Sequence, residues 1–272
     1  MALCAILLAG SRAGAQLVLP GAIHAAEPSS GGTANPHANP VPGVKNKPKP
    51  IGLKPPGEET IIGRDLVRNG STGAITFARG ADRALTITRL SLAGEEISAP
   101  SEQCRVDVIA NQPITPRFAD RPAGVSRYEV DLAACPFSFD VLNGAVFISR
   151  EKPECDFVAA DCRVDPTGLW GPPGDSIGDK EAKAMEHARP HAESNVRANF
   201  RAVLASAGKD KTAIKTIAAE QAGFSSEREV ACRNYAREEV HGFCALRMTE
   251  ARALALEAKY NEMPRNTRPQ SP

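Results

Sequence analysis

The chain has 272 residues and a formal net charge of +1, from 33 basic and 32 acidic side chains. Its length suits about two domains of roughly 150 residues each. A charge so close to zero argues against non-specific binding to nucleic acid or to an anionic membrane surface. Because only 5% of the residues are aromatic, the hydrophobic cores must be built mainly from Ala, Leu, Ile and Val.

Residues 1–26 form an apolar segment, rich in small residues, that ends at Ala25 and Ala26. Such a segment is typical of a secretory signal peptide. The alternative is an uncleaved membrane helix, but Arg12 and Pro20 leave no uninterrupted apolar run of about 18 residues. We therefore expect a periplasmic or secreted protein whose mature chain has no transmembrane helix.

Residues 27–57 are rich in Pro, Gly and Asn and contain almost no large apolar side chains. A segment of this composition buries too little surface to offset the entropy of ordering it. We expect a disordered or extended Pro-rich linker here, and a disordered tail over residues 264–272.

Residues 58–165 alternate apolar and polar side chains, as in Ile75 and Phe77 or Phe137 and Phe139. A period of two is typical of half-buried strands. Asn143-Gly144 predicts a hairpin with a two-residue type I′ turn. About six or seven short strands separated by Gly, Pro and Asn predict an antiparallel β-sandwich or a small barrel.

The protein has seven cysteines, and removal of Cys4 with the signal peptide leaves six. An even number in an exported chain favours disulfides. Four of them lie in the β region, where the simplest pairing joins Cys104 to Cys135 and Cys155 to Cys162. Three pairings are possible, and the sequence does not select one. These four are Cys104, Cys135, Cys155 and Cys162.

Residues 166–178 contain adjacent prolines and several glycines, which predict a second linker. Trp170 is expected to anchor this linker, or to serve as a stacking platform for a ligand if it is exposed. Ser176 and Asp179 resemble a capping box at the start of a helix that Pro190 should kink or split.

Residues 179–263 have a helical period, with further helices from about Asp210 and about Cys244. We therefore expect an α+β protein with separate domains, the second a three-helix bundle or helical hairpin. A Cys232–Cys244 disulfide would close a loop of about 13 residues and contribute roughly 3 kcal/mol. A zinc or redox site is the alternative, although the chain has no CxxC motif.

Gln221 and Arg228 are polar residues on the same apolar helix face as Phe224. Buried polar groups need partners, and the next helix offers Thr249, Glu250 and Arg252. We expect a network between the two helices that fixes their register.

These residues resemble a motif of the LprI-type lysozyme inhibitor family, over about residues 185–263. The resemblance implies a small, exported, helical and disulfide-linked module of the bacterial envelope. Phe224 stands where the family usually has Trp, and the first helix lacks the further cysteines usual in the family. The residues that carry the resemblance are Gln221, Phe224, Arg228, Cys232, Cys244, Thr249 and Arg252.

The resemblance supports an envelope binding protein that inhibits a lysozyme-like muramidase, an enzyme that uses two carboxylates in a cleft. The loop over residues 236–243, closed by the expected disulfide, is the candidate contact through Glu238, Glu239 and His241. Pinning a loop lowers the ordering cost of binding. The simpler alternative is a solvated connector between two helices.

Two further hypotheses remain open. One is a structural or interaction module of the periplasm that binds another envelope protein without inhibition. The other is a metal-binding protein, because His187 and His191 are spaced i, i+4 as zinc and copper ligands often are. The chain has none of the common nucleotide-binding, hydrolase or metalloprotease motifs, so we expect no enzyme and no cofactor.

Overall fold

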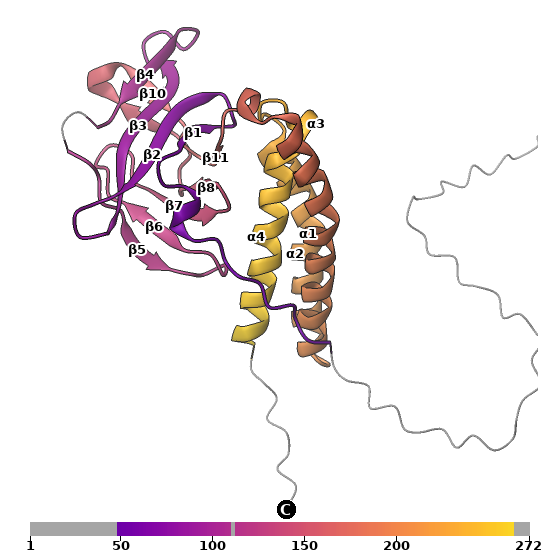
Figure 1. The fold of residues 1–272 in the computed structure, drawn as a ribbon. Coiled ribbons are helices and arrows are strands. Elements are labelled where there is room, and N and C mark those ends of the chain that lie inside the picture. The colour runs from indigo at the N-terminus through magenta and orange to yellow at the C-terminus, as the bar shows by residue number, and fades with distance from the viewer. Residues whose placement is uncertain (1–47, 110–111, 264–272) are drawn as a thin grey trace, which may run out of the picture. The chain divides into compact units, whose positions relative to one another are not determined.

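The computed structural model describes residues 48–109 and 112–263. The predicted signal peptide, most of the first linker and the predicted tail lie outside the described residues. The described residues belong to one compact unit. In this unit an antiparallel sheet is followed by a helical region (Figure 1).

The described part of the sheet has 11 strands, and consecutive strands along it are all antiparallel. Its order is β5-β6-β7-β8-β11-β1-β2-β3-β10-β9. The remaining strand, β4, pairs with the edge of β3 opposite to β2. The strands are β1 (Asp65–Arg68), β2 (Thr72–Arg79), β3 (Leu85–Glu96), β4 (Gln103–Asp107), β5 (Arg117–Asp120), β6 (Arg127–Val130), β7 (Phe137–Leu142), β8 (Ala145–Ser149), β9 (Cys155–Phe157), β10 (Cys162–Val164) and β11 (Gly168–Gly171).

The sheet curls until the chain leading into β5 meets β3. Ile87 and Ile114 exchange two backbone hydrogen bonds of 2.8 and 3.0 Å. The apolar side chains that alternate along the strands fill the enclosed space, where the rings of Phe77 and Phe139 lie 5.2 Å apart and are fully buried. The period of two in the sequence therefore identified the inward face of this sheet.

The hairpin predicted at Asn143-Gly144 joins β7 to β8, with Leu142 opposite Ala145. Its turn is not type I′. Only Gly144 has a positive φ, of 71°. In this turn only the second central residue needs a positive φ. Gly suits that position, and Asn can precede it with an ordinary backbone conformation.

The expected linker at residues 166–178 is wrong in its first part, because β11 lies there and pairs with both β1 and β8. Trp170 is 1% exposed, and its indole N–H donates to the carbonyl oxygen of Pro166 at 2.8 Å. It is therefore a core residue of the sheet and is not available as an exposed stacking platform.

Two disulfides join parts of the sheet, Cys104 to Cys162 and Cys135 to Cys155. The simplest pairing by sequence distance is wrong. Although β9 and β10 are neighbours, Cys155 lies opposite Val164 and Cys162 lies opposite Phe157, so the two cysteines do not face each other directly.

The helical region contains α1 (Asp179–Ser206), α2 (Lys211–Cys232), α3 (Glu238–His241) and α4 (Phe243–Glu262). Pro190 does not split α1, which continues through it. The carbonyl that loses its hydrogen bond to Pro190 belongs to Glu186, an exposed residue that water can reach. The helix expected from about Asp210 is α2, and the Asp210 side chain caps it. At the start of α1, the capping position is taken by Gly178 and not by Ser176.

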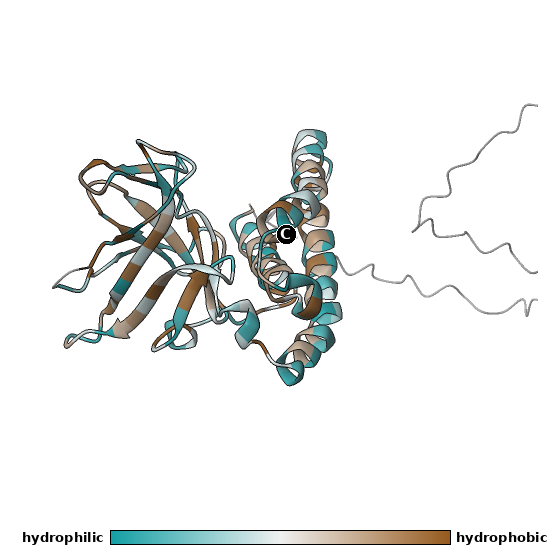
Figure 2. Ribbon diagram, turned by 90° about the horizontal axis from the view of Figure 1, so that it is seen from above, coloured by the Kyte–Doolittle hydropathy of each residue, from teal (hydrophilic) through white to brown (hydrophobic). Residues whose placement is uncertain are grey.

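The separation into two domains is not confirmed. Leu142, Ala145 and Leu169 of the sheet share one hydrophobic cluster with Met185 and Leu246 of the helices. Seen from above, the helices lie along one side of the sheet (Figure 2). The sheet and the helices therefore stabilise each other through common buried surface.

Residues 48–57 run along the helices to the sheet, and we call this segment the strap (Figure 1). The side chain of Asn199 is fully buried in α1 and accepts the N–H of Ile51 at 2.6 Å. The N–H of Leu53 donates to Glu257 of α4 at 2.9 Å. The disorder predicted up to residue 57 is thus wrong for this last part, because a buried amide in α1 needs the backbone of the strap as its partner.

Candidate functional site

The loop between α2 and α4 is fixed at both ends by a disulfide. Cys232 is the last residue of α2 and Cys244 is in the first turn of α4, and their Cα atoms lie 5.5 Å apart. Both side chains are buried. The pairing expected from the sequence is therefore present, and the loop between these residues cannot open without breaking a covalent bond.

The inner side of the loop packs against the sheet. The hydroxyl of Tyr235 donates to the carbonyl oxygen of Pro172 at 2.6 Å, and the N–H of Ala236 donates to the carbonyl oxygen of Asn69 at 2.8 Å. The Tyr235 ring also stacks on Phe243, with centroids 5.5 Å apart. The loop is therefore held by the sheet as well as by the disulfide.

Glu238 caps the start of α4. Its carboxylate accepts the backbone N–H groups of Cys244 and Ala245 at 2.9 and 2.8 Å. Burial raises the pKa of this carboxyl, and the two N–H donors oppose that shift. Glu238 thus has a structural role at the start of α4, and its half-buried side chain also lines the groove beside the loop.

His241 is also an internal residue, because its side chain is 1% exposed. Its Nδ1 accepts the N–H of Phe243 at 3.1 Å, so the ring proton lies on Nε2, which donates to the carbonyl oxygen of Ala236 at 3.0 Å. Both ring nitrogens are therefore occupied within the loop.

The outward side of the loop includes Arg237, Glu239 and Val240, which are exposed, as are Arg233 and Asn234 directly after α2. Val240 is 53% exposed, which is high for a large apolar side chain. Arg237 has a left-handed backbone, with φ of 59°, at the point where the chain turns into α3. Of the three residues expected to contact a partner, only Glu239 lies on this side.

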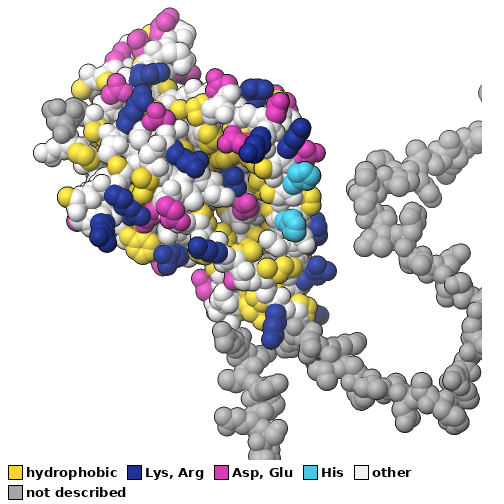
Figure 3. Space-filling view, viewed as in Figure 1, with side chains coloured by type: hydrophobic (Ala, Val, Ile, Leu, Met, Phe, Trp, Pro, Cys, Tyr) yellow, Lys and Arg dark blue, Asp and Glu magenta, His cyan; other side chains and the backbone are white. Residues whose placement is uncertain are grey.

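The loop borders a groove of about 510 Å³ on the surface of the helical region. Its charged lining consists of three arginines and three glutamates: Arg189, Arg228, Arg233, Glu229, Glu238 and Glu239. Figure 3 shows that basic and acidic side chains are mixed over the face that it displays. The loop is therefore surrounded by charges of both signs.

The residues that resemble the family motif form a network between α2 and α4. Arg228 donates to the hydroxyl of Thr249 at 2.8 Å, and Thr249 donates to the carbonyl oxygen of Ala245 at 2.6 Å. Arg252 donates to the amide oxygen of Gln221 at 3.2 Å. The partners expected from the sequence are thus present, with one exception: Glu250 instead pairs with Arg247 on its own helix.

Phe224 lies between the two arginines of this network. The guanidinium carbons of Arg228 and Arg252 are 5.5 and 5.6 Å from the centre of its ring, within the range of cation–π attraction. Burial lowers the pKa of Arg252. The network fixes the register of α2 against α4, and it thereby positions both ends of the loop.

The chain matches no family model. The comparisons with curated proteins and with solved structures give no match either. Evidence on function therefore comes from the residues and geometry of the chain itself.

His187 and His191 are exposed on α1. Among residues 48–109 and 112–263, no group of three or more His, Cys, Asp or Glu side chains is arranged to hold a metal ion. Nor does the described part of the chain contain a helix with the length and apolarity needed to cross a membrane.

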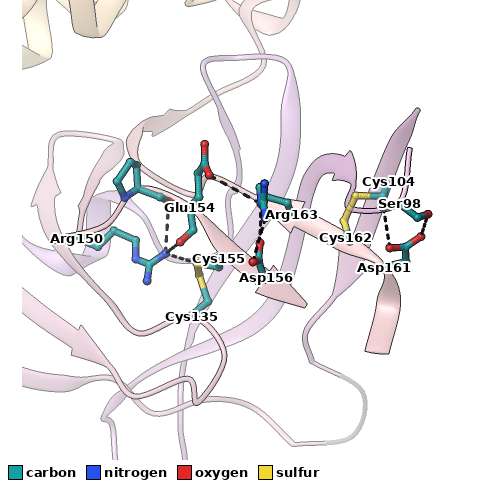
Figure 4. A network of polar contacts seen from close by, with 11 residues as sticks. Ser98, Cys104, Cys135, Arg150, Glu154, Cys155, Asp156, Asp161, Cys162 and Arg163 are labelled. Carbon is teal, nitrogen blue, oxygen red and sulfur yellow. Dashed lines mark hydrogen bonds and ion pairs between the residues drawn. A yellow bond between two sulfur atoms is a disulfide. The ribbon is translucent and has the colours of Figure 1, made fainter. Parts of the chain in front are cut away.

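Charged side chains surround the two disulfides of the sheet (Figure 4). Arg163 forms a two-point pair with Asp156 at 2.7 and 3.2 Å, and this hydrogen bonding lowers the pKa of Asp156. Arg150 contacts Cys155 Sγ and donates to the carbonyl oxygen of Glu154 at 2.7 Å. These contacts hold the short strands β9 and β10 in place, and we assign them a structural role.

The sequence analysis did not identify Arg237 and Val240 as exposed residues of the loop. Which side chains of a four-residue helix face outward depends on how the loop docks on the sheet. The sequence carries no periodic signal for that docking over so short a segment.

Proposed function

We propose that the protein is an exported envelope binding protein, periplasmic or secreted, that inhibits a lysozyme-like muramidase. The support from the sequence is the resemblance of residues 221–256 to the LprI-type motif. The three disulfides add support, because structural disulfides are typical of proteins that fold in oxidising compartments.

The observation that carries the proposal is the rigid presentation of Arg237 and Val240. The disulfide fixes the ends of the loop, and Tyr235 and His241 fix its inner side. Binding through such a loop costs little ordering entropy, because the loop has its bound shape before it meets a partner.

The chemistry of a muramidase cleft suits this surface. Its two catalytic carboxylates offer a target for a cation, and arginine forms planar two-point hydrogen bonds with a carboxylate. We infer that Arg237 faces these carboxylates while Val240 contacts an apolar part of the cleft. The revised contact set is therefore Arg237, Glu239 and Val240, with Glu238 and His241 in supporting roles.

Inhibition of a purified muramidase by the mature chain, starting at Glu27, tests the proposal. We expect Arg237→Ala to weaken inhibition by about 30-fold, as for an interfacial arginine that contributes about 2 kcal/mol. Arg201→Ala, an exposed arginine of α1, is the charge-matched control and should inhibit like the natural chain.

A second pair of variants tests the apolar contact that we assign to Val240. Val240→Ala should weaken inhibition, whereas Val230→Ala, which trims a valine of α2 that is 65% exposed, should not. A natural mature chain that leaves the muramidase unaffected at large molar excess would rule out inhibition.

The alternative is a non-inhibitory interaction module of the envelope. It is favoured by the internal use of Glu238 and His241, which leaves the loop a smaller contact surface than the sequence predicts. If this alternative holds, the loop serves to join the helices to the sheet, and substitutions at Arg237 change no muramidase reaction.

A further inference from the structure

Two titratable side chains, Glu238 and His241, face each other inside the loop between α2 and α4. Oε2 of Glu238 lies 3.8 Å from Nδ1 of His241. The side chain of His241 is 1% exposed and that of Glu238 is 17% exposed. A small local movement would bring the two atoms to the distance of a hydrogen bond, which is about 2.7–3.2 Å between nitrogen and oxygen.

Each of these two atoms accepts a backbone N–H. Nδ1 of His241 accepts from Phe243 at 3.1 Å, and Oε2 of Glu238 accepts from Cys244 at 2.9 Å. Both donors belong to the first turn of α4, where backbone N–H groups have no partner within the helix. The start of α4 is therefore held by two acceptor atoms that carry no proton.

A proton that enters this pair disturbs one of the two contacts. On Nδ1 it would point at the N–H of Phe243, because an imidazole nitrogen that carries a proton can only donate. On Oε2 it would replace the N–H of Cys244. In either position the best partner of the proton is the other side chain of the pair. Proton uptake therefore draws Glu238 and His241 together, and the first turn of α4 loses an acceptor.

The surroundings of the pair carry charges of both signs. Burial raises the pKa of Glu238, whereas Arg189 of α1 acts in the opposite direction. The centres of the Tyr235 and His241 rings lie 5.8 Å apart, and Arg247 of α4 acts on Tyr235. Because burial is the largest of these effects, Glu238 takes up a proton at a higher pH than an exposed carboxyl does. Four further charged residues line the groove that Glu238 also lines: Arg228, Glu229, Arg233 and Glu239.

We propose that Glu238 and His241 form a proton-operated switch that loosens the loop in acid. At neutral pH the two side chains hold the first turn of α4 and keep the loop rigid. Below neutral pH one proton joins them and releases the N–H of Phe243 or of Cys244. The consequence for inhibition rests on the proposed function, because the loop then loses the fixed shape in which it presents Arg237.

The change is confined to the loop. A carboxyl whose pKa is raised in the folded protein binds a proton more readily there than in the unfolded chain, so proton uptake by Glu238 does not favour unfolding. The Cys232–Cys244 disulfide and the hydrogen bond from Tyr235 to the sheet stay in place. We therefore expect the loop to loosen while the sheet and the helices remain folded.

Amide hydrogen exchange of the mature chain tests the switch without a muramidase. The protection factor of Phe243 or Cys244, which corrects for the intrinsic effect of pH, should fall at least about 10-fold between roughly pH 7.5 and pH 5. His241→Asn places a carbonyl oxygen near the position of Nδ1 and removes the basic nitrogen, so it should abolish the fall. His191→Asn, which replaces an exposed histidine of α1, is the matched control and should behave like the natural chain.

Unchanged protection of both amides over this range overturns the inference, and so does an equal fall in the natural chain and in His241→Asn. If His241→Asn does not fold, Glu238→Gln decides. Its amide oxygen still accepts an N–H but takes up no proton, so the fall should move to lower pH by at least about one unit. A fall at the same pH in Glu238→Gln would contradict the role of the pair.

Inhibition measured at the same two pH values separates the switch from the proposed function. On acidification, inhibition by the natural chain should weaken at least about 10-fold more than inhibition by His241→Asn. Equal weakening in the two chains would contradict the consequence for inhibition. A fall in amide protection in a chain that inhibits no muramidase would support the switch and overturn the proposed function alone.

Discussion

The hydroxyl of Tyr235, in the loop after α2, donates a hydrogen bond of 2.6 Å to the carbonyl oxygen of Pro172, just after β11. The two residues are 63 positions apart, and their contact joins the helical region to the sheet. Tyr235 is 2% exposed, and both partners belong to one compact unit. The loop that we propose as a binding surface is thus also the joint between the two halves of the fold.

Removal of this hydrogen bond should lower the stability of the whole unit. Tyr235→Phe keeps the ring but leaves the Pro172 carbonyl without the hydroxyl, so the free energy of unfolding should fall by about 1 kcal/mol. Urea unfolding followed by Trp170 fluorescence, for the sheet, and by far-UV circular dichroism, for the helices, should give one coincident transition. Two separate transitions would show that the sheet and the helices unfold independently.

Stability should fall in alkaline solution because of two buried tyrosines. Burial raises the pKa of Tyr235, and burial together with the hydrogen bond to Glu58 raises the pKa of Tyr128. A tyrosine in the unfolded chain ionises near about pH 10, so above that pH the unfolded state releases protons that the folded state keeps.

Each of these tyrosines should therefore lower the free energy of unfolding by about 1.4 kcal/mol per pH unit above about pH 10, and neither should affect stability at neutral pH. Unfolding measured from neutral to alkaline pH tests this. Tyr235→Phe should remove one of the two contributions. An unchanged slope in that variant would contradict the buried, protonated state assigned to Tyr235.

Two glycines with the same backbone angle provide a test of the joint between loop and sheet. Gly63 and Gly70 both have φ of 69°, but a Cβ on Gly63 would meet no atom within 4 Å, whereas a Cβ on Gly70 would lie 2.9 Å from Cε1 of Tyr235. Gly63→Ala should lower the free energy of unfolding by about 1 kcal/mol, because it introduces backbone strain alone. Gly70→Ala should cost about 1–3 kcal/mol more, because Tyr235 must also move. Equal losses of unfolding free energy for the two variants would place Tyr235 away from Gly70.

Glu238 and Glu239 are sequence neighbours with different roles. Glu238→Ala removes the acceptor for the N–H groups of Cys244 and Ala245, and it should lower the free energy of unfolding by about 1–2 kcal/mol. Glu239→Ala should change it by less than about 0.5 kcal/mol, because Glu239 is exposed. Thermal or urea unfolding of the two variants measures the difference, and the opposite order would reverse the assignment of the inner and outer sides of the loop.

Much of the fold could be predicted because its periodic signals are strong. Ile75, Phe77 and Phe139 alternate with polar residues and are buried in the sheet. The partners of Gln221 and Arg228 on α4 follow from the helical period together with the need to satisfy buried polar groups.

The remaining features depend on contacts that join distant parts of the chain. The register of β9 against β10 decides which cysteines meet, and local spacing does not contain that register. Trp170 lies in a strand bounded by glycines, which has too few residues to show a period of two. The strap is ordered because Asn199 of α1, 148 residues from Ile51, needs its backbone as a partner.

For a related reason, the sequence did not predict which residues of the α2–α4 loop face the sheet and which face outward. Glu238, Glu239 and His241 are all polar, and composition does not distinguish the residue that caps α4 from the residue that faces outward. The left-handed backbone at Arg237 and the docking of Tyr235 on the sheet set the orientation of the loop.

The most direct test of the account is steady-state kinetics of a muramidase on a soluble oligosaccharide with increasing amounts of the mature chain. We predict competitive inhibition, in which the apparent KM rises and kcat is unchanged, because Arg237 and the substrate would occupy the same cleft. Arg237→Ala should need about 30-fold more protein for the same rise, as for the loss of about 2 kcal/mol. An unchanged KM, or a lowered kcat that does not depend on Arg237, would contradict the proposal that this loop enters the cleft.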